Sequence, residues 1–177
     1  MAHALTAVRL VLIAPIATGF AQPGVIGATT LGCLLCLAIA TDILDGRVAR
    51  ATGTASAAGQ AFDHTTDCVF VTSGLIGAAV TGQVPWVLPL LVATAFTQYV
   101  LDSYFLHRQK RLRMSTLGRW NGILYFVPLV ILASARLPFF DIVEPFLRAC
   151  VTLLAYGLIA STLVSMADRA LAPRGTN

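Results

Sequence analysis

The sequence predicts an all-α, polytopic membrane protein with six transmembrane helices. Only 11% of its 177 residues are charged and 57% are hydrophobic, whereas a soluble domain carries roughly 25% charged residues. The hydrophobic residues gather in runs near the length of about 20 residues that a spanning helix needs. Such a chain cannot cover its apolar surface in water, which excludes a soluble enzyme, a disordered chain and a nucleic-acid-binding protein. We expect one domain, residues 1–177, in a lipid bilayer.

Six apolar runs define the predicted spans, and each ends at a charge, a glycine or a proline. The runs cover residues 5–20, 25–50, 55–81, 84–107, 120–137 and 142–166. The connections between them are short, except for residues 108–119, which are rich in arginine. Short connections predict that successive helices are antiparallel neighbours.

The basic residues predict the orientation in the membrane. With six spans, both termini lie on the same side as Arg47, Arg50 and the arginine-rich connection 108–119. Most other arginines also fall near that side, and loops rich in arginine stay in the cytoplasm. We therefore expect both termini to be cytoplasmic. The membrane is expected to be the inner membrane of a bacterium.

A cleavable signal peptide is the alternative interpretation of residues 1–21. The segment has no Lys or Arg near its start, and Arg9 interrupts the apolar run. Removing it would also leave five spans. We expect the segment to be retained as the first helix.

Half of the 8 acidic residues lie inside the second and third predicted spans. They are Asp42, Asp45, Asp63 and Asp67. A carboxylate near the centre of a bilayer costs several kcal/mol, so four together need compensation. Arg47 and Arg50 are too few to provide it, and Arg47 points away from the acidic face. No other nearby side chain is expected to supply enough positive charge.

The spacing predicts that the four carboxylates face one cleft. At 100° per residue, the acidic arcs of the two helices are about 100° and 80° wide. One arc carries Asp42, Asp45, Gly46 and Ala49, and the other carries Gly59, Asp63 and Asp67. The small residues leave room for a ligand beside the acids. We expect an active-site cleft between the second and third helices, open to the cytoplasmic side.

Converging carboxylates favour a site for divalent cations. Hard cations such as Mg²⁺ take oxygen ligands and commonly lie between carboxylates and a substrate's phosphates. Two such ions can clamp a diphosphate and stabilise an in-line displacement at phosphorus. A cation transporter is the alternative of a different class, because intramembrane acids also mark ion pathways. Acids in a transporter would be spread through the membrane depth, whereas here they gather in one half.

The full motif resembles the signature of the CDP-alcohol phosphotransferase (CDP-alcohol phosphatidyltransferase) family. It reads Asp42-x-x-Asp45-Gly46-x-x-Ala49-Arg50, then Gly59-x-x-x-Asp63-x-x-x-Asp67. Thr6 and Arg9 also have the spacing that the family often shows in its first helix. These residues extend the resemblance beyond residues 42–67.

The resemblance implies an enzyme of phospholipid biosynthesis, in which an alcohol attacks the β-phosphorus of a CDP-linked donor and CMP leaves. By this resemblance the four aspartates bind two Mg²⁺ or Mn²⁺ ions, and Asp67 is the candidate general base. It also assigns Gly46, Ala49, Arg50 and Gly59 to the nucleotide and diphosphate. A homodimer is implied as well.

The acceptor is less defined than the donor chemistry. CDP-diacylglycerol as donor and glycerol 3-phosphate as acceptor are our first choice, with Arg113 and Arg119 as phosphate ligands because a guanidinium binds phosphate in a fork geometry. Inositol phosphate, serine, or a CDP-aminoalcohol donor with a lipid acceptor are the alternatives. His64 is offset by about 100° from Asp63, so we expect it to pack or to hydrogen-bond rather than join the site.

Overall fold

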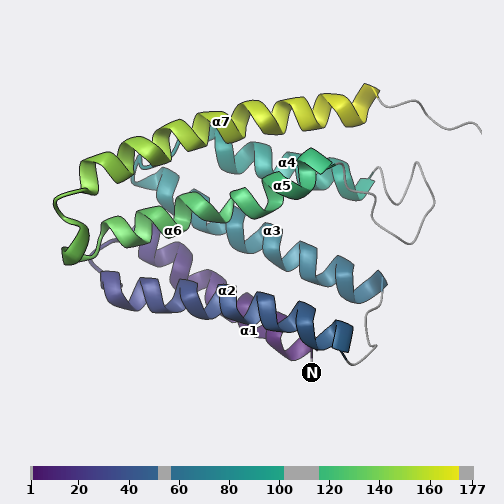
Figure 1. The fold of residues 1–177 in the computed structure, drawn as a ribbon, viewed down its shortest axis with the longest axis horizontal. Coiled ribbons are helices and arrows are strands. Elements are labelled where there is room, and N and C mark those ends of the chain that lie inside the picture. Colours follow the sequence, from purple (N-terminus) through teal and green to yellow (C-terminus); the bar gives the residue numbers. More distant parts are fainter. Residues whose placement is uncertain (1, 52–56, 102–115, 172–177) are drawn as a thin grey trace, which may run out of the picture.

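A computed structural model gives the fold and describes residues 2–51, 57–101 and 116–171 (Figure 1). The helices are α1 (Ala2–Ala21), α2 (Ala28–Ala51), α3 (Ala57–Val80), α4 (Val87–Leu101), α5 (Thr116–Leu124), α6 (Phe126–Ala135) and α7 (Glu144–Leu171), with a 3₁₀ turn, η2, at Pro138–Phe140. The described residues contain no strand. The predicted all-α class is confirmed.

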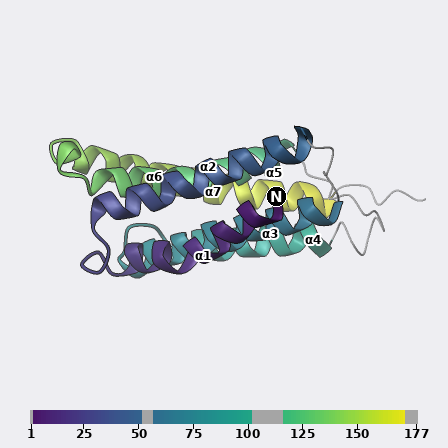
Figure 2. The same cartoon turned by 90° about the horizontal axis from the view of Figure 1, so that it is seen from below.

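The helices form an elongated bundle whose described elements run back and forth along its long axis (Figure 1). Helices α1, α3 and α4 lie on one side, and α2, α5 and α6 lie on the other (Figure 2). Helix α7 packs against α4, α5 and α6. The start of α1 and the ends of α2, α4 and α7 share one end of the bundle (Figure 1). This is the arrangement that six antiparallel spans require.

The predicted fifth span, 120–137, is not one continuous helix. It is divided at Tyr125, between α5 and α6. Pro128 has no N–H, so the carbonyl of Leu124 loses the partner that a regular helix would provide. The Tyr125 hydroxyl lies 2.6 Å from the hydroxyl of Thr162 in α7 and ties the break to the neighbouring helix.

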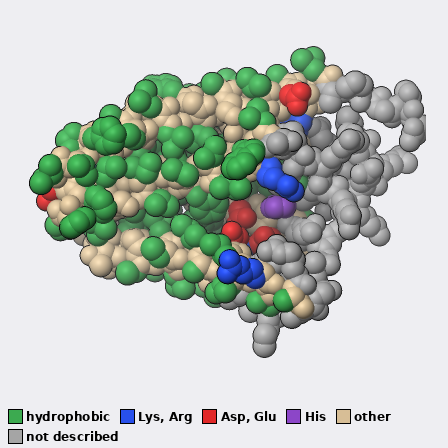
Figure 3. Space-filling view, viewed as in Figure 1, with side chains coloured by type: hydrophobic (Ala, Val, Ile, Leu, Met, Phe, Trp, Pro, Cys, Tyr) green, Lys and Arg blue, Asp and Glu red, His purple; other side chains and the backbone are tan. Residues whose placement is uncertain are grey.

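Three helical segments are long and apolar enough to cross a membrane. They are Ala28–Asp45, Leu117–Ala135 and Glu144–Leu171, and Thr6–Ala21 and Val87–Leu101 are shorter apolar helices. Large apolar side chains such as Val11, Leu90 and Leu153 are exposed on the outside of the bundle, and hydrophobic side chains cover most of the face in Figure 3. These features indicate a membrane protein, while the count of six spans stays a prediction.

The most extensive helix contact joins α1 to α3, and Gly77 permits it. A Cβ atom at Gly77 would lie 2.4 Å from the carbonyl oxygen of Ala17 and 3.0 Å from the Cβ of Phe20. Both obstacles belong to α1, and one is backbone. A larger residue would therefore push the two helices apart.

We expect Gly77→Ala to lower the free energy of unfolding by about 1–3 kcal/mol, because overpacking forces backbone shifts. Gly157→Ala is the matched control, since nothing lies within 4 Å of a Cβ atom at that position in α7. Thermal unfolding in detergent measures both. Equal melting temperatures for the two variants would contradict the close approach of α1 and α3.

Candidate active site

The four aspartates converge around one buried arginine. The Arg9 guanidinium, from α1, donates from Nη1 to Asp42 Oδ1 at 2.6 Å and also to Asp67 Oδ1, and from Nη2 to Asp63 Oδ1. Its Nη2 lies 3.7 Å from Asp45 Oδ2. Arg9 is only 1% exposed, so α1, α2 and α3 meet at a single ionic cluster.

Helix α1 completes the cluster with a second side chain. The Thr6 hydroxyl donates to Asp45 Oδ2, and both residues are buried. Counting 1.5 Å per residue, Arg9 lies about 10 Å from the start of α1, and Asp42 about 13 Å from the end of α2. Because those two helix ends share one end of the bundle (Figure 1), the arginine and the acids reach the same depth.

The expectation that no nearby side chain supplies enough positive charge to the acids did not foresee the contacts of Arg9. Arg9 contacts all four carboxylates, whereas Arg47 is exposed, as its position on the helix predicted. One guanidinium still balances only one of four negative charges. The cluster thus keeps an excess of negative charge, which favours further cations.

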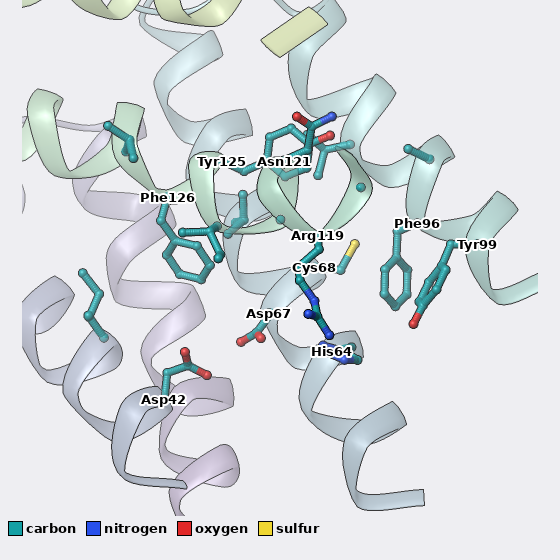
Figure 4. Close-up of a pocket in the computed structure, with 18 of the residues that line it drawn as sticks. Asp42, His64, Asp67, Cys68, Phe96, Tyr99, Arg119, Asn121, Tyr125 and Phe126 are labelled. Carbon is teal, nitrogen blue, oxygen red and sulfur yellow. The ribbon is translucent and has the colours of Figure 1, made fainter. Parts of the chain in front are cut away.

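A cavity of about 630 Å³ opens beside the cluster. Acidic side chains lie in a hollow near one end of the bundle, next to basic and histidine side chains (Figure 3). Asp42 and Asp67 line the cavity from α2 and α3, and their carboxylates point toward one another (Figure 4). Asp45 and Asp63 are not part of its lining. The cavity extends beyond the cleft predicted between the second and third helices, because α4, α5, α6 and α7 also contribute to its wall.

Arg119, predicted as a phosphate ligand, lines this cavity from α5. Its guanidinium extends toward Asp67 and His64 (Figure 4). Gly59 lies in the first turn of α3 and is half-buried. Gly46, Ala49 and Arg50 belong to α2, but their side chains lie outside what the structure describes, and so does Arg113.

His64 was expected to turn away from the acids, and that expectation was wrong. Its imidazole lines the cavity next to Asp67 (Figure 4). One ligand atom each from Asp63, His64 and Asp67 lies within 4.8 Å of the others. On the helix His64 is offset by about 60° from Asp67, which a side chain as long as histidine spans.

Two more polar side chains of the cavity were missed by sequence reasoning. Arg169 of α7 lines the wall, donating to the backbone carbonyls of Ser165 and Ala95, with its guanidinium 5.9 Å from the Tyr99 ring. The Tyr99 hydroxyl is buried, and it has no hydrogen-bond partner among the described residues. Tyr99 lies within a predicted apolar span and Arg169 lies just beyond one, so no local signal marked them.

Comparison of the sequence with known protein families identifies this group of residues. The model of the CDP-alcohol phosphatidyltransferase family matches residues 1–167. The chain belongs to this family. No curated protein and no solved structure matches the chain.

Membership of the CDP-alcohol phosphatidyltransferase family makes the chain a transferase that acts on a CDP-alcohol. Members of the family generally depend on a divalent metal. The site fits one, because it combines carboxylate oxygens with an imidazole within 4.8 Å of one another and carries an uncompensated negative charge. Carboxylates and imidazole are both ordinary ligands of divalent cations.

Proposed function

We propose that this protein transfers a phosphatidyl group from CDP-diacylglycerol to a small alcohol and releases CMP, in phospholipid biosynthesis. The observation that carries the proposal is the convergence of Asp42, Asp45, Asp63 and Asp67 beside a cavity large enough for a ligand. Two Mg²⁺ or Mn²⁺ ions are proposed as cofactors. They would be held by the four aspartates.

The reaction forms one P–O bond and breaks another. The acceptor hydroxyl oxygen bonds to the β-phosphorus, the bond from that phosphorus to the bridging oxygen breaks, and CMP departs with that oxygen. Bound divalent cations would supply charge stabilisation to the diphosphate. Asp67, which lines the cavity, would accept the hydroxyl proton as the base, which must come within about 3 Å of that proton's oxygen.

The walls of the cavity support a lipid substrate. Val71, Phe96, Val127 and Val130 line it, and they come from three different helices. Apolar walls beside an acidic end suit a ligand with acyl chains at one end and a diphosphate at the other. This combination fits CDP-diacylglycerol as donor.

The basic side chains of the wall support a phosphorylated acceptor. Arg119 and Arg169 both line the cavity that holds Asp67, and guanidinium groups bind phosphate in a fork geometry. Glycerol 3-phosphate is the acceptor that we propose. Inositol phosphate would satisfy the same chemistry, whereas serine would leave the phosphate ligands unused.

Membrane placement and assembly complete the proposal. The arginine bias supports cytoplasmic termini and an inner membrane location, with six spans. A homodimer is proposed from the family resemblance.

We expect purified protein to release CMP from CDP-diacylglycerol when Mg²⁺ or Mn²⁺ and glycerol 3-phosphate are present. A chelator should reduce the rate to background, and excess Mg²⁺ should restore it. Labelled donor with a panel of alcohols identifies the lipid product. Metal-independent release, or no release with any alcohol, would contradict the proposal, and metal uptake into proteoliposomes without a CDP compound would instead support a transporter.

A further inference from the structure

His64 adds a nitrogen donor to an otherwise oxygen-rich site. It follows Asp63 directly and precedes Asp67 by three residues, and side chains three or four positions apart are neighbours on a helix. The three ligand atoms lie within 4.8 Å of one another. All three therefore reach one point beside the cavity without a change in the backbone of α3.

The His64 imidazole has no competing partner in the described part of the chain. Its interactions with Asp63, Asp42, Arg119 and Arg9 are electrostatic, and none is a hydrogen bond. The ring lines the cavity beside Asp67 (Figure 4). A helix-packing histidine would be covered by neighbours or would hydrogen-bond to a backbone carbonyl. This one presents its ring to the space where a cation would bind.

A nitrogen donor changes which metal the site prefers. Mg²⁺ favours oxygen ligands and retains several waters, whereas imidazole suits later first-row metals, whose affinities for a given site rise from Mn²⁺ towards Co²⁺ and beyond. A site of four carboxylates alone would discriminate weakly among these ions. With His64 as a ligand, one of the metal positions gains affinity for a transition metal.

We propose that His64 is a metal ligand and that Asp63, His64 and Asp67 form a mixed nitrogen and oxygen position that selects a divalent transition metal over Mg²⁺. This inference rests on the proposed function, because the position belongs to the same metal-dependent site. It adds His64 as a ligand besides the four aspartates. It also names the chemical class of ion that this position binds.

Co²⁺ is the probe, because its optical spectrum reports a nitrogen ligand. Affinities of purified protein for Co²⁺ and Mg²⁺ are measured by calorimetry without any CDP compound. His64→Gln is expected to weaken Co²⁺ binding by about tenfold or more and to alter the Co²⁺ spectrum. Mg²⁺ affinity should stay nearly constant, which also shows that the variant is folded. His64→Glu should move the preference back toward Mg²⁺.

Cys68→Ala is the matched control, because Cys68 lines the same cavity one turn further along α3. It should leave both affinities and the spectrum unchanged. Equal Co²⁺ binding in His64→Gln and the native protein would overturn the inference, as would a loss confined to Cys68→Ala. Binding without substrate keeps the two ideas separable: an absence of CMP release contradicts the proposed function alone, and an unchanged Co²⁺ spectrum contradicts the role of His64 alone.

Discussion

Asp67→Asn is expected to lower the rate of CMP release by about a hundredfold or more, the scale at which removal of a general base acts. Asp67 lines the cavity, whereas Asp45 and Asp63 do not. An amide cannot take up the acceptor's proton. Its carbonyl oxygen can still bind a divalent cation, so binding of the CDP-linked donor should be largely retained.

A split between turnover and binding distinguishes a base from a residue that only binds metal. Asp67→Asn should reduce kcat with little change in donor affinity, while Asp42→Ala, which removes both ligand oxygens, should weaken metal and donor binding together. Steady-state rates and equilibrium binding of the nucleotide measure the two quantities. Asp141→Asn, at an exposed carboxylate in the turn between η2 and α7, is the control. Full activity of Asp67→Asn would remove Asp67 from the role of base.

The convergence of the acids was accessible from the sequence because it depends on local geometry. Asp42 and Asp45 share a face by helical periodicity, and Asp63 and Asp67 do so on the next helix. The short connection between the two helices then places both faces at similar depth. Such reasoning needs only residues that are close together in the chain, and the structure brings all four carboxylates to Arg9.

Arg9 was out of reach of that reasoning because its contacts are distant in sequence. It is separated by 33 residues from Asp42 and by 58 from Asp67. A single charged residue in an apolar helix does not fix how that helix is rotated against its neighbours. The available signal was the position of Arg9 within the first helix, because an arginine two turns inside a span needs an acidic partner.

The break at Tyr125 and the orientation of His64 were missed for different reasons. Pro128 does mark a helix boundary, but the apolar run continues across it, and hydropathy alone merges α5 and α6. For His64, an offset from Asp63 was taken as an offset from the whole acidic face, although the ring lies nearer to Asp67 in rotation. A side chain as long as histidine can reach an acidic face that is 80° wide from a position just outside it.

Arg9→Gln is expected to destabilise the metal-free protein while it strengthens metal binding. The guanidinium is 1% exposed and contacts four carboxylates, so its removal leaves buried negative charge without a partner. Breaking a buried ion pair costs about 3–5 kcal/mol. Because three of the carboxylates are 25–38% exposed, we expect the lower end, about 3 kcal/mol.

Metal affinity separates this role from simple packing. Arg9 and a divalent cation compete for the same carboxylate oxygens, so removing the guanidinium should lower the dissociation constant for Mn²⁺ and enlarge the increase in melting temperature that Mn²⁺ produces. Arg9→Lys keeps the charge and should lie between the variant and the native protein. Arg47→Gln, at an exposed arginine on α2, should change neither quantity. If Arg9→Gln left the melting temperature in chelator unchanged, Arg9 would not be the cation that balances these acids, and the site would need another source of positive charge before it binds metal.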